Sequence, residues 1–343
     1  MNFIYHSAIV LLMCCAGTIA AETNAPTTAP PARPRTAAEL VREHRNSLGF
    51  FEGKTGKGSG FIADFKGQKF LLSNVHVIAG IKSAVFTPLD RSPVKIGNGS
   101  VAVGHDILAL SVIAGGSAIP MAESVDKEVL IGDPVVVLGN AEGAGVINTL
   151  EGKIIGIGPE RIEVDAPFVP GNSGSPIIHL PTGKVIGIAS YMSVKKIGPR
   201  EEKVRRFGYR LDSVTQWQAI NWNWFYADAD RMKSIEESTQ ALGGLFNEFA
   251  GFVVNARRRG VSWGAVALGN QDVKYEFFNK SARNREQGEK SLSALCLSDI
   301  QQAESRLSYD FFKRRLTEEK ADRELLSTLF KEISGGVYIK RRN

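Results

Sequence analysis

Residues 171–176 read GNSGSP, and this stretch carries more information about the fold than any other part of the chain. Gly171 and Gly174 flank Ser173, and glycine lets a backbone turn sharply enough for neighbouring N–H groups to converge on one oxyanion. A serine hydroxyl becomes a nucleophile when a histidine accepts its proton and a carboxylate orients that histidine. The stretch therefore predicts a nucleophile at Ser173 and requires a histidine and an aspartate elsewhere.

Both partners occur upstream of this loop, each at the border of an apolar run. The run LLSNVH at residues 71–76 ends in His76, and the run DILAL at residues 106–110 begins with Asp106. The predicted catalytic residues are therefore His76, Asp106 and Ser173. The order histidine, aspartate, serine along the chain is that of the chymotrypsin-type β-barrel proteases and differs from the order in subtilisins and α/β-hydrolases.

Six segments, in the expected order, resemble the trypsin-like serine proteases and among them the HtrA (Deg) type. These segments include the predicted catalytic residues and the strands before and after the nucleophile: 58–62, 73–77, 105–110, 132–140, 165–174 and 185–188. The resemblance implies that the backbone N–H groups of Gly171 and Ser173 form an oxyanion hole. Ser175 stands where most relatives carry glycine, a departure that leaves all three predicted catalytic residues in place.

The same resemblance implies a substrate pocket between the loop before Ser173 and the strand after it. The residues assigned to its walls are Phe168, Ser190, Tyr191 and Met192. Residues 166–169 contain no acid, which disfavours cleavage after Lys or Arg, and Met192 would narrow the entrance. Glutamate-specific relatives carry a histidine where this chain has Ala189. We therefore expect small or medium apolar residues before the scissile bond.

Composition is that of a soluble globular protein, and the resemblance implies polypeptide substrates. The chain has 343 residues, 43% hydrophobic and 23% charged, with a formal net charge of +6. This modest charge does not indicate nucleic acid as a partner. No histidine and carboxylate cluster has the spacing of metal ligands, so neither a metal nor a cofactor is expected. The sequence does not predict the oligomeric state.

The two ends of the chain differ from its middle in amino-acid composition and pattern. An apolar run at residues 9–16, followed by small residues, predicts a signal peptide and therefore export to the periplasm or secretion. The run is too short to span a membrane comfortably, and signal removal would leave Cys296 as the one cysteine, without an internal disulfide. The expected organisation is a signal peptide at 1–21, a Pro/Ala/Thr-rich linker at 22–44, a protease domain at 45–215 and a helical region at 216–343.

The predicted fold is an all-β double β-barrel of the chymotrypsin type followed by a mainly α-helical C-terminal region. Short β-rich runs separated by glycine favour a sandwich or a barrel, and the resemblance selects a pair of barrels. Beyond Ser213, apolar residues recur at helical spacing, and no PDZ-like pattern is evident. The aromatic cluster after Thr215 predicts that Trp217 and Trp222 anchor the first helix against the barrels.

Two further function classes remain open from the sequence. The first is a catalytically inactive protease fold that binds unfolded segments or a partner without cutting. The second is an exported adaptor that acts through the helical region at 216–343, with the barrels as a scaffold. The sequence assigns no function to that region.

Overall fold

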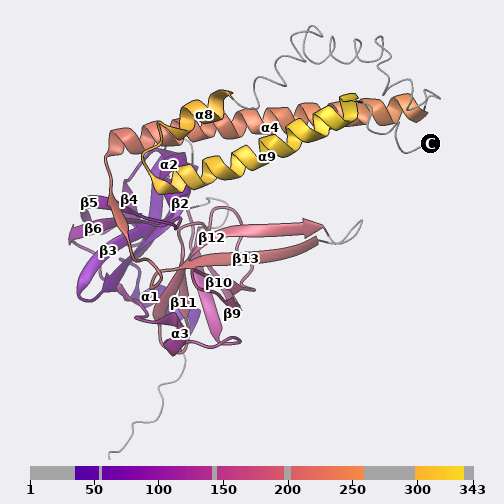
Figure 1. Cartoon of the computed structure of the whole chain (residues 1–343). Helices are drawn as coiled ribbons and strands as arrows, with labels where there is room; N and C mark the ends of the chain where they lie inside the picture. The colour runs from indigo at the N-terminus through magenta and orange to yellow at the C-terminus, as the bar shows by residue number, and fades with distance from the viewer. Residues whose placement is uncertain (1–34, 54–55, 141–144, 197–201, 259–297, 336–343) are drawn as a thin grey trace, which may run out of the picture. The chain divides into compact units, whose positions relative to one another are not determined.

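The computed structural model describes residues 35–53, 56–140, 145–196, 202–258 and 298–335, all within one compact unit (Figure 1). The predicted signal peptide, most of the predicted linker and Cys296 lie outside the described residues. None of the helices in the described part is long and apolar enough to cross a membrane.

The N-terminal half of the β structure is a curved antiparallel sheet preceded by helix α1 (Ala37–Glu43). Its strands are β1 (Leu48–Gly53), β2 (Gly56–Phe65), β3 (Gln68–Ser73), β4 (Phe86–Pro88), β5 (Lys95–Ala102), β6 (Leu108–Ala114), β7 (Ile119–Pro120) and β14 (Trp217–Ala219). The strand order is β14-β5-β6-β3-β2-β1-β4, and β7 pairs with β2 in parallel. Helix α2 (Val75–Ile81) follows β3 directly.

A tight turn explains the register of β2 and β3. Phe65 pairs with Gln68, which leaves Lys66 and Gly67 as a two-residue loop. Both have positive φ, 53° and 82°, as a type I′ hairpin turn requires. The Asp64 carboxylate accepts the Gly67 N–H at 2.9 Å and completes the turn.

The second half of the β structure is a closed six-stranded barrel. Its strands are β8 (Pro134–Gly139), β9 (Asn148–Ile157), β10 (Arg161–Val164), β11 (Pro176–His179), β12 (Lys184–Lys196) and β13 (Glu202–Arg210). They close in the order β10-β13-β12-β11-β8-β9, with the short helix α3 (Val125–Glu128) before β8. Its interior is filled by branched aliphatic side chains such as Val137, Ile154 and Ile177.

The predicted mostly-β chymotrypsin-like class with C-terminal helices is confirmed, with one refinement to the first barrel. Strand pairing closes the second barrel, whereas the first sheet ends at β14 and β4 without a ladder between them in the described residues. Gly49 lets β1 and β4 approach closely, because a Cβ there would lie 2.3 Å from the Thr87 carbonyl oxygen.

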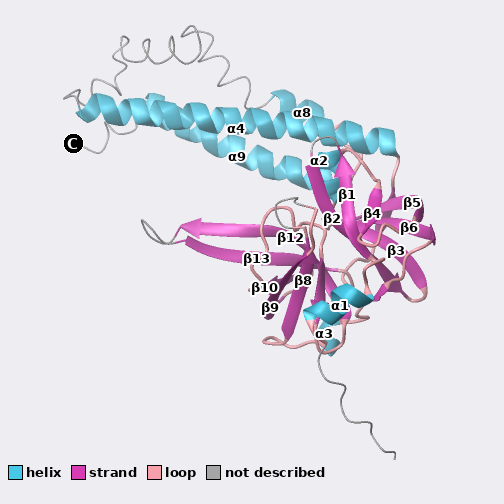
Figure 2. Ribbon diagram, turned by 180° about the vertical axis from the view of Figure 1, so that it is seen from behind, coloured by secondary structure: helices cyan, strands magenta, loops and turns pink. Residues whose placement is uncertain are grey.

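The described helices of the C-terminal region are α4 (Trp222–Arg258), α8 (Ser298–Glu304) and α9 (Asp310–Gly335). Helices α4 and α9 lie side by side next to α2 (Figures 1 and 2). One hydrophobic cluster joins side chains of this region to the N-terminal sheet and α2: Leu71, Val75, Ile78, Leu108, Phe225, Met232, Ile235, Tyr309, Phe312 and Leu316. The helices are therefore packed on the first sheet by a shared core.

The prediction that Trp217 anchors the helical region is wrong. Trp217 lies on the edge strand β14, where it pairs with Ala102 and its side chain is 43% exposed. Trp222 is half-buried and stacks on Tyr226, but the fully buried anchor is Phe225. Because β14 pairs with β5, the side chain of Trp217 points outward. Phe225, in the first turn of α4, points into the core instead.

Candidate active site

His76 is placed by the junction between β3 and α2. The strand ends at Ser73, and buried Asn74 donates from its side chain to the Asp106 carbonyl oxygen at 2.7 Å. This bond ties the start of α2 to the loop between β5 and β6. As a result, the His76 backbone N–H donates to Asp106 Oδ1 at 3.1 Å, and the ring Nδ1 lies 2.5 Å from Oδ2.

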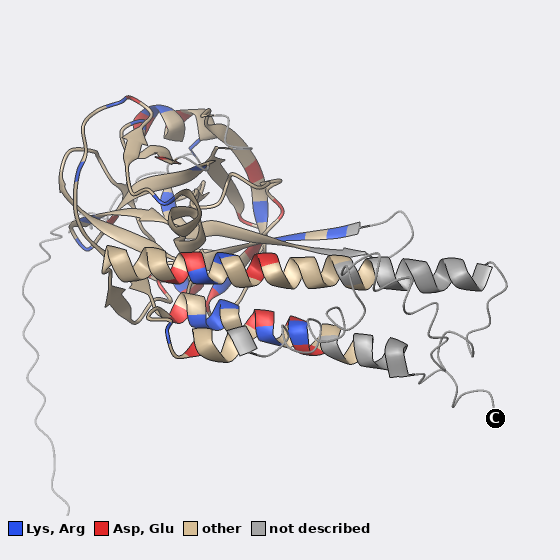
Figure 3. Ribbon diagram, turned by 90° about the horizontal axis from the view of Figure 1, so that it is seen from above, with Lys and Arg blue, Asp and Glu red and all other residues tan. Residues whose placement is uncertain are grey.

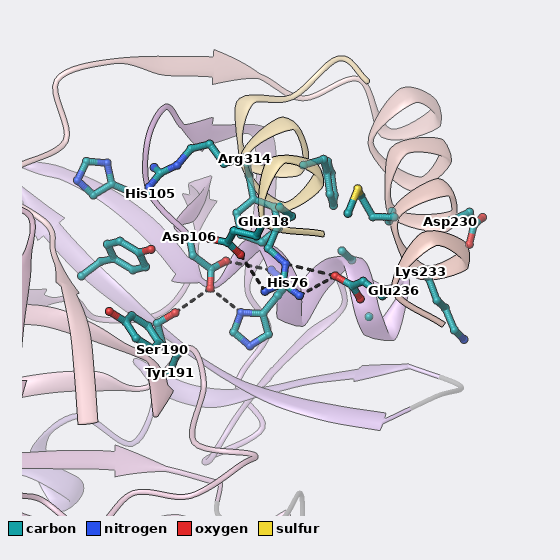
Figure 4. A pocket seen from close by; sticks show the side chains of 18 of the residues that line it. His76, His105, Asp106, Ser190, Tyr191, Asp230, Lys233, Glu236, Arg314 and Glu318 are labelled. Atoms are coloured by element: carbon teal, nitrogen blue, oxygen red, sulfur yellow. Dashed lines mark hydrogen bonds and ion pairs between the residues drawn. The ribbon is translucent and has the colours of Figure 1, made fainter. Parts of the chain in front are cut away.

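Asp106 is almost completely buried, and its carboxylate receives a third hydrogen bond, from the second barrel. The Ser190 hydroxyl on β12 donates to Asp106 Oδ2 at 2.8 Å (Figure 4). Such a carboxylate holds the imidazole in the tautomer that carries its proton on Nδ1 and leaves Nε2 free to accept one. Sequence analysis missed this contact of Ser190, because only folding brings β12 next to Asp106.

The pKa of His76 is raised above its ordinary value of 6.5. Burial disfavours the charged ring by desolvation, but the negative charge of Asp106 and its hydrogen bond to the ring outweigh that effect. Arg315 on α9 lowers the pKa slightly and Glu236 on α4 raises it. The C-terminal helices thus contribute to the electrostatic field at His76.

The loop that carries Ser173 is held by a turn and by the first sheet. Val169 and Asn172 close the turn, because the Val169 N–H donates to Asn172 Oδ1 and the Asn172 N–H donates to the Val169 carbonyl. Ser59 on β2 donates its N–H to the Ser173 carbonyl at 3.2 Å. Gly174 has a φ of +86°, and a Cβ there would lie 2.2 Å from the Ser59 carbonyl oxygen, so glycine is required.

The Ser173 hydroxyl points at the second barrel in this structure. It donates to the Ser190 carbonyl oxygen at 3.1 Å, and among the described residues it makes no hydrogen bond to His76. Within the same described part, the N–H groups of Gly171 and Ser173 donate to no other group. The fold therefore joins His76 to Asp106 directly, and joins Ser173 to them through Ser190.

Of the four predicted pocket residues, three line a cavity next to His76 and one, Phe168, does not. Phe168 is buried in the core of the second barrel, and half-buried Met192 packs against that core. Ser190, Tyr191 and Met192 line a cavity that His76 and Asp106 also line. Tyr191 stacks on Phe207 with ring centroids 5.1 Å apart.

This cavity of about 1040 Å³ has a wall that sequence analysis did not assign. Helices α4 and α9 contribute polar residues to it, as Figure 4 shows: Asp230, Lys233, Glu236, Arg314 and Glu318. Lys/Arg and Asp/Glu residues both occur along the described turns of the two helices (Figure 3). The helical region thus borders the space next to His76.

His105 also borders the cavity, although both of its ring nitrogens are engaged elsewhere. Nδ1 lies 3.0 Å from the Val103 carbonyl oxygen and Nε2 lies 2.9 Å from the Ser213 hydroxyl. Its neighbour Asp106, in the same loop between β5 and β6, is the residue that contacts His76. The described residues hold no group of three or more side chains suited to a metal ion.

Comparison with known proteins identifies the part of the chain that carries this arrangement. A family model described as a trypsin-like peptidase domain matches residues 58–188. A putative serine protease, HhoA, of Synechocystis is 34% identical over 148 residues, which cover 39% of this chain and 36% of that protein. A probable periplasmic serine endoprotease, DegP-like, of Rhizobium meliloti is 31% identical over 46% of this chain and 32% of that protein.

Solved structures are also similar to this chain. The crystal structure of the serine endoprotease from Yersinia pestis is 22% identical, with a TM-score of 0.40, and the match covers 52% of this chain and 63% of that chain. The chain spans about a third of the length of the two curated relatives. Residues 58–188 thus match a trypsin-like peptidase domain, and over this part the chain is similar to serine proteases of HtrA/Deg type.

Proposed function

We propose that this chain is an exported serine endopeptidase that cleaves polypeptides through His76, Asp106 and Ser173. The position of Ser190 carries this proposal. Its hydroxyl donates to Asp106 and its carbonyl accepts from Ser173, so one residue touches both ends of the proposed triad. The relatives named serine protease and endoprotease support the same reaction class.

In the proposed reaction, Ser173 leaves the Ser190 carbonyl and transfers its proton to His76 Nε2 as Oγ attacks the peptide carbonyl carbon. The N–H groups of Gly171 and Ser173 are the proposed donors to the oxyanion, and losing one such donor costs about 3–4 kcal/mol of transition-state stabilisation. His76 then gives the proton to the leaving amine as the C–N bond breaks. Water attacks the acyl-enzyme with His76 again as the base, which returns Ser173.

The substrate is proposed to bind as an extended segment along β12. Strand β11 pairs with β12 only as far as Ile188, whereas β13 continues to pair with β12 to Lys196. Among the described residues, no strand pairs with this edge of β12 beyond Ile188, so the edge can accept another strand. With the scissile residue next to Ser190, the preceding residues would lie beside Tyr191 and Met192, and a small or medium apolar residue is expected before the scissile bond.

The location is also proposed. The predicted signal peptide at 1–21 and the periplasmic name of the Rhizobium meliloti relative support export.

The alternative function is a catalytically inactive binding module or an adaptor, and the relatives' names do not favour it.

The test is digestion of a reduced, carboxymethylated polypeptide, which is unfolded and offers every sequence as an extended segment. The unsubstituted chain should fragment it, and Ser173→Ala should not. Ser305→Ala, which changes an exposed serine outside the cavity lining, is the matched control and should cleave normally. Equal fragmentation by Ser173→Ala and the unsubstituted chain would place the nucleophile elsewhere.

A further inference from the structure

Two arginines border the cavity next to His76 without an acidic partner. Arg161 lies on β10 and Arg314 lies on α9, so they come from different walls. No carboxylate of the described residues is within ion-pair distance of either one. The other basic side chains of the lining do have such partners: Lys82 with Asp230, Lys233 with Glu237 and Arg315 with Glu236.

Arg161 is held in one orientation by aromatic neighbours. Its guanidinium carbon lies 5.4 Å from the Tyr191 ring centroid and 5.3 Å from that of Tyr209. Nη1 donates to the Tyr191 hydroxyl at 2.8 Å, whereas Nε is buried and has no hydrogen-bond partner. Burying a positive charge without a negative partner costs free energy, and a bound anion would offset that cost. The planar guanidinium, held in one orientation, has the geometry to bind a carboxylate through two hydrogen bonds.

Arg314 is placed by the first turn of α9. Its Nη1 donates to the Gly104 carbonyl, and Asp310 one turn earlier accepts the Gly104 N–H at 2.9 Å. Burial raises the pKa of Tyr209, and both Arg161 and Arg314 oppose that shift. Geometry places both arginines near Tyr209: Arg161 lies over its ring, and His105, which follows the Gly104 that Arg314 contacts, packs against the same ring with centroids 5.6 Å apart. Both arginines line the same cavity.

The position of this pair relative to the substrate follows from β12. Tyr191, which Arg161 contacts, directly follows Ser190, whose carbonyl accepts from the nucleophile Ser173. Ser173 itself does not line the cavity. A strand added to the edge of β12 would thus bring residues that precede the scissile bond next to Arg161.

We propose that Arg161, assisted by Arg314, binds an aspartate or glutamate side chain located two to four residues before the scissile bond. This inference rests on the proposed endopeptidase function, and it names a class of substrate for the same site. A bidentate bond between guanidinium and carboxylate supplies both affinity and orientation. Helix α9 thereby contributes a specificity residue to a cavity that the β structure, α2 and α4 also line.

The test measures binding to the Ser173→Ala chain, so that cleavage does not enter the result. The probes are octapeptides with a neutral fluorophore and valine before the scissile bond, each with one glutamate two, three or four residues upstream. Matched peptides carry glutamine instead. At one position the glutamate peptide should bind about tenfold more tightly, a preference that about 0.5 M salt should reduce.

Substitutions in the same background assign the preference to its residue. Arg161→Gln should reduce the preference below about threefold, and Arg161→Lys should restore part of it. Arg205→Gln is the matched control, because Arg205 also stacks on an aromatic ring but lies outside the cavity lining. Equal binding of glutamate and glutamine peptides at all three positions would overturn the proposal, and so would a full preference in Arg161→Gln.

Failure of the subsite is distinguishable from failure of the proposed function. The salt dependence is measured without substituting Arg161, so it stands even where Arg161→Gln does not fold. A chain that digests polypeptides but shows no charge preference refutes the subsite alone. A chain that digests nothing but retains a preference that depends on Arg161 refutes the peptidase and supports the subsite.

Discussion

Ser190 connects the two β units at the proposed catalytic residues. Its side chain and its backbone contact different members of the proposed triad, Asp106 through the hydroxyl and Ser173 through the carbonyl. Asp106 is buried, so a lost donor is not replaced freely by water. The hydroxyl therefore stabilises the charge that orients His76.

Ser190→Ala should lower kcat/KM about tenfold or more, because a hydrogen bond to a buried charge contributes about 1.5–3 kcal/mol. Steady-state hydrolysis of a peptide substrate measures this. Ser305→Ala, at an exposed position outside the cavity lining, should leave kcat/KM unchanged. Full activity in Ser190→Ala would show that the two donors from His76 suffice for Asp106.

The raised pKa of His76 predicts the pH dependence of activity. Neutral His76 is the base, so activity should rise with pH through a midpoint above 6.5. The charged ring is favoured in the folded state, so its contribution to stability is present below about 6.5 and is lost as pH rises through the folded pKa.

Asp106→Asn removes the charge that raises the pKa of His76, while desolvation by burial remains. The midpoint should therefore fall below that of the unsubstituted chain. Turnover should fall by about 10⁴, the loss that the same change causes in chymotrypsin-type enzymes. The rate of reaction with a fluorophosphonate across pH measures both effects, and a flat profile in the unsubstituted chain would refute the role of His76.

The residues that could be predicted from the sequence are those that lie in short local motifs: His76, Asp106 and the nucleophile loop. Each lies in a short run of characteristic residue types, so no long-range contact was needed to find it. The observed contacts of Arg161 and of the Ser190 hydroxyl were not predicted. Their partners come from other strands, and no periodicity or spacing encodes those contacts.

At the scale of elements, one buried carboxylate fixes the junction of α4 and α9. Asp228 on α4 accepts the N–H groups of Ser308 and Tyr309 at 2.6 and 3.1 Å, and Arg231 pairs with it at 3.1 Å. The bonds to Ser308 and Tyr309 hold the segment that leads into α9. Because Asp310 and Arg314 then contact Gly104, the start of α9 also borders the Asp106 loop.

Asp228→Ala should destabilise the folded chain by about 2–3 kcal/mol, because two backbone donors lose their buried acceptor. Thermal unfolding measures this loss. Asp230→Asn is the matched control two residues along α4, since its pair with Lys82 is half-exposed and contributes about 0–1 kcal/mol. Equal melting temperatures for the two variants would show that Asp228 does not fix the start of α9.

Helical periodicity in the C-terminal half predicted that helices form there, but not which residues contact the barrels. The cluster of tryptophans in the sequence led to the prediction that Trp217 is an anchor, whereas Phe225 is the residue buried in the shared core. Side-chain size was a poor guide because backbone pairing of β14 with β5 decides which way Trp217 points. The face of a helix that meets a sheet depends on the packing of both.

At the scale of the whole molecule, the first sheet, α2 and the C-terminal helices share one core. Phe225, Met232, Tyr309 and Phe312 are buried in the same cluster as side chains of α2 and the first sheet. The predicted boundary at 215 remains a prediction, and this core extends across it. The helices thus cover α2, the element that carries His76.

Truncation after Thr215 should uncover that apolar surface, because each large buried side chain contributes about 1.5–3 kcal/mol. Residues 36–215 alone should aggregate or unfold at a lower temperature than the mature chain. Size-exclusion chromatography and thermal unfolding measure this. A monomeric fragment as heat-resistant as the full mature chain would show that the helices form an independent module.

The central claim is that Ser173 is an activated nucleophile, and a fluorophosphonate tests it most directly. The mature chain is treated with the reagent at a pH above the His76 midpoint, and tandem mass spectrometry locates the modified residue. The account predicts a single adduct on the Ser173 hydroxyl, which is absent from Ser173→Ala and slowed in Asp106→Asn. An adduct on another serine, or a folded chain that forms none, would contradict it.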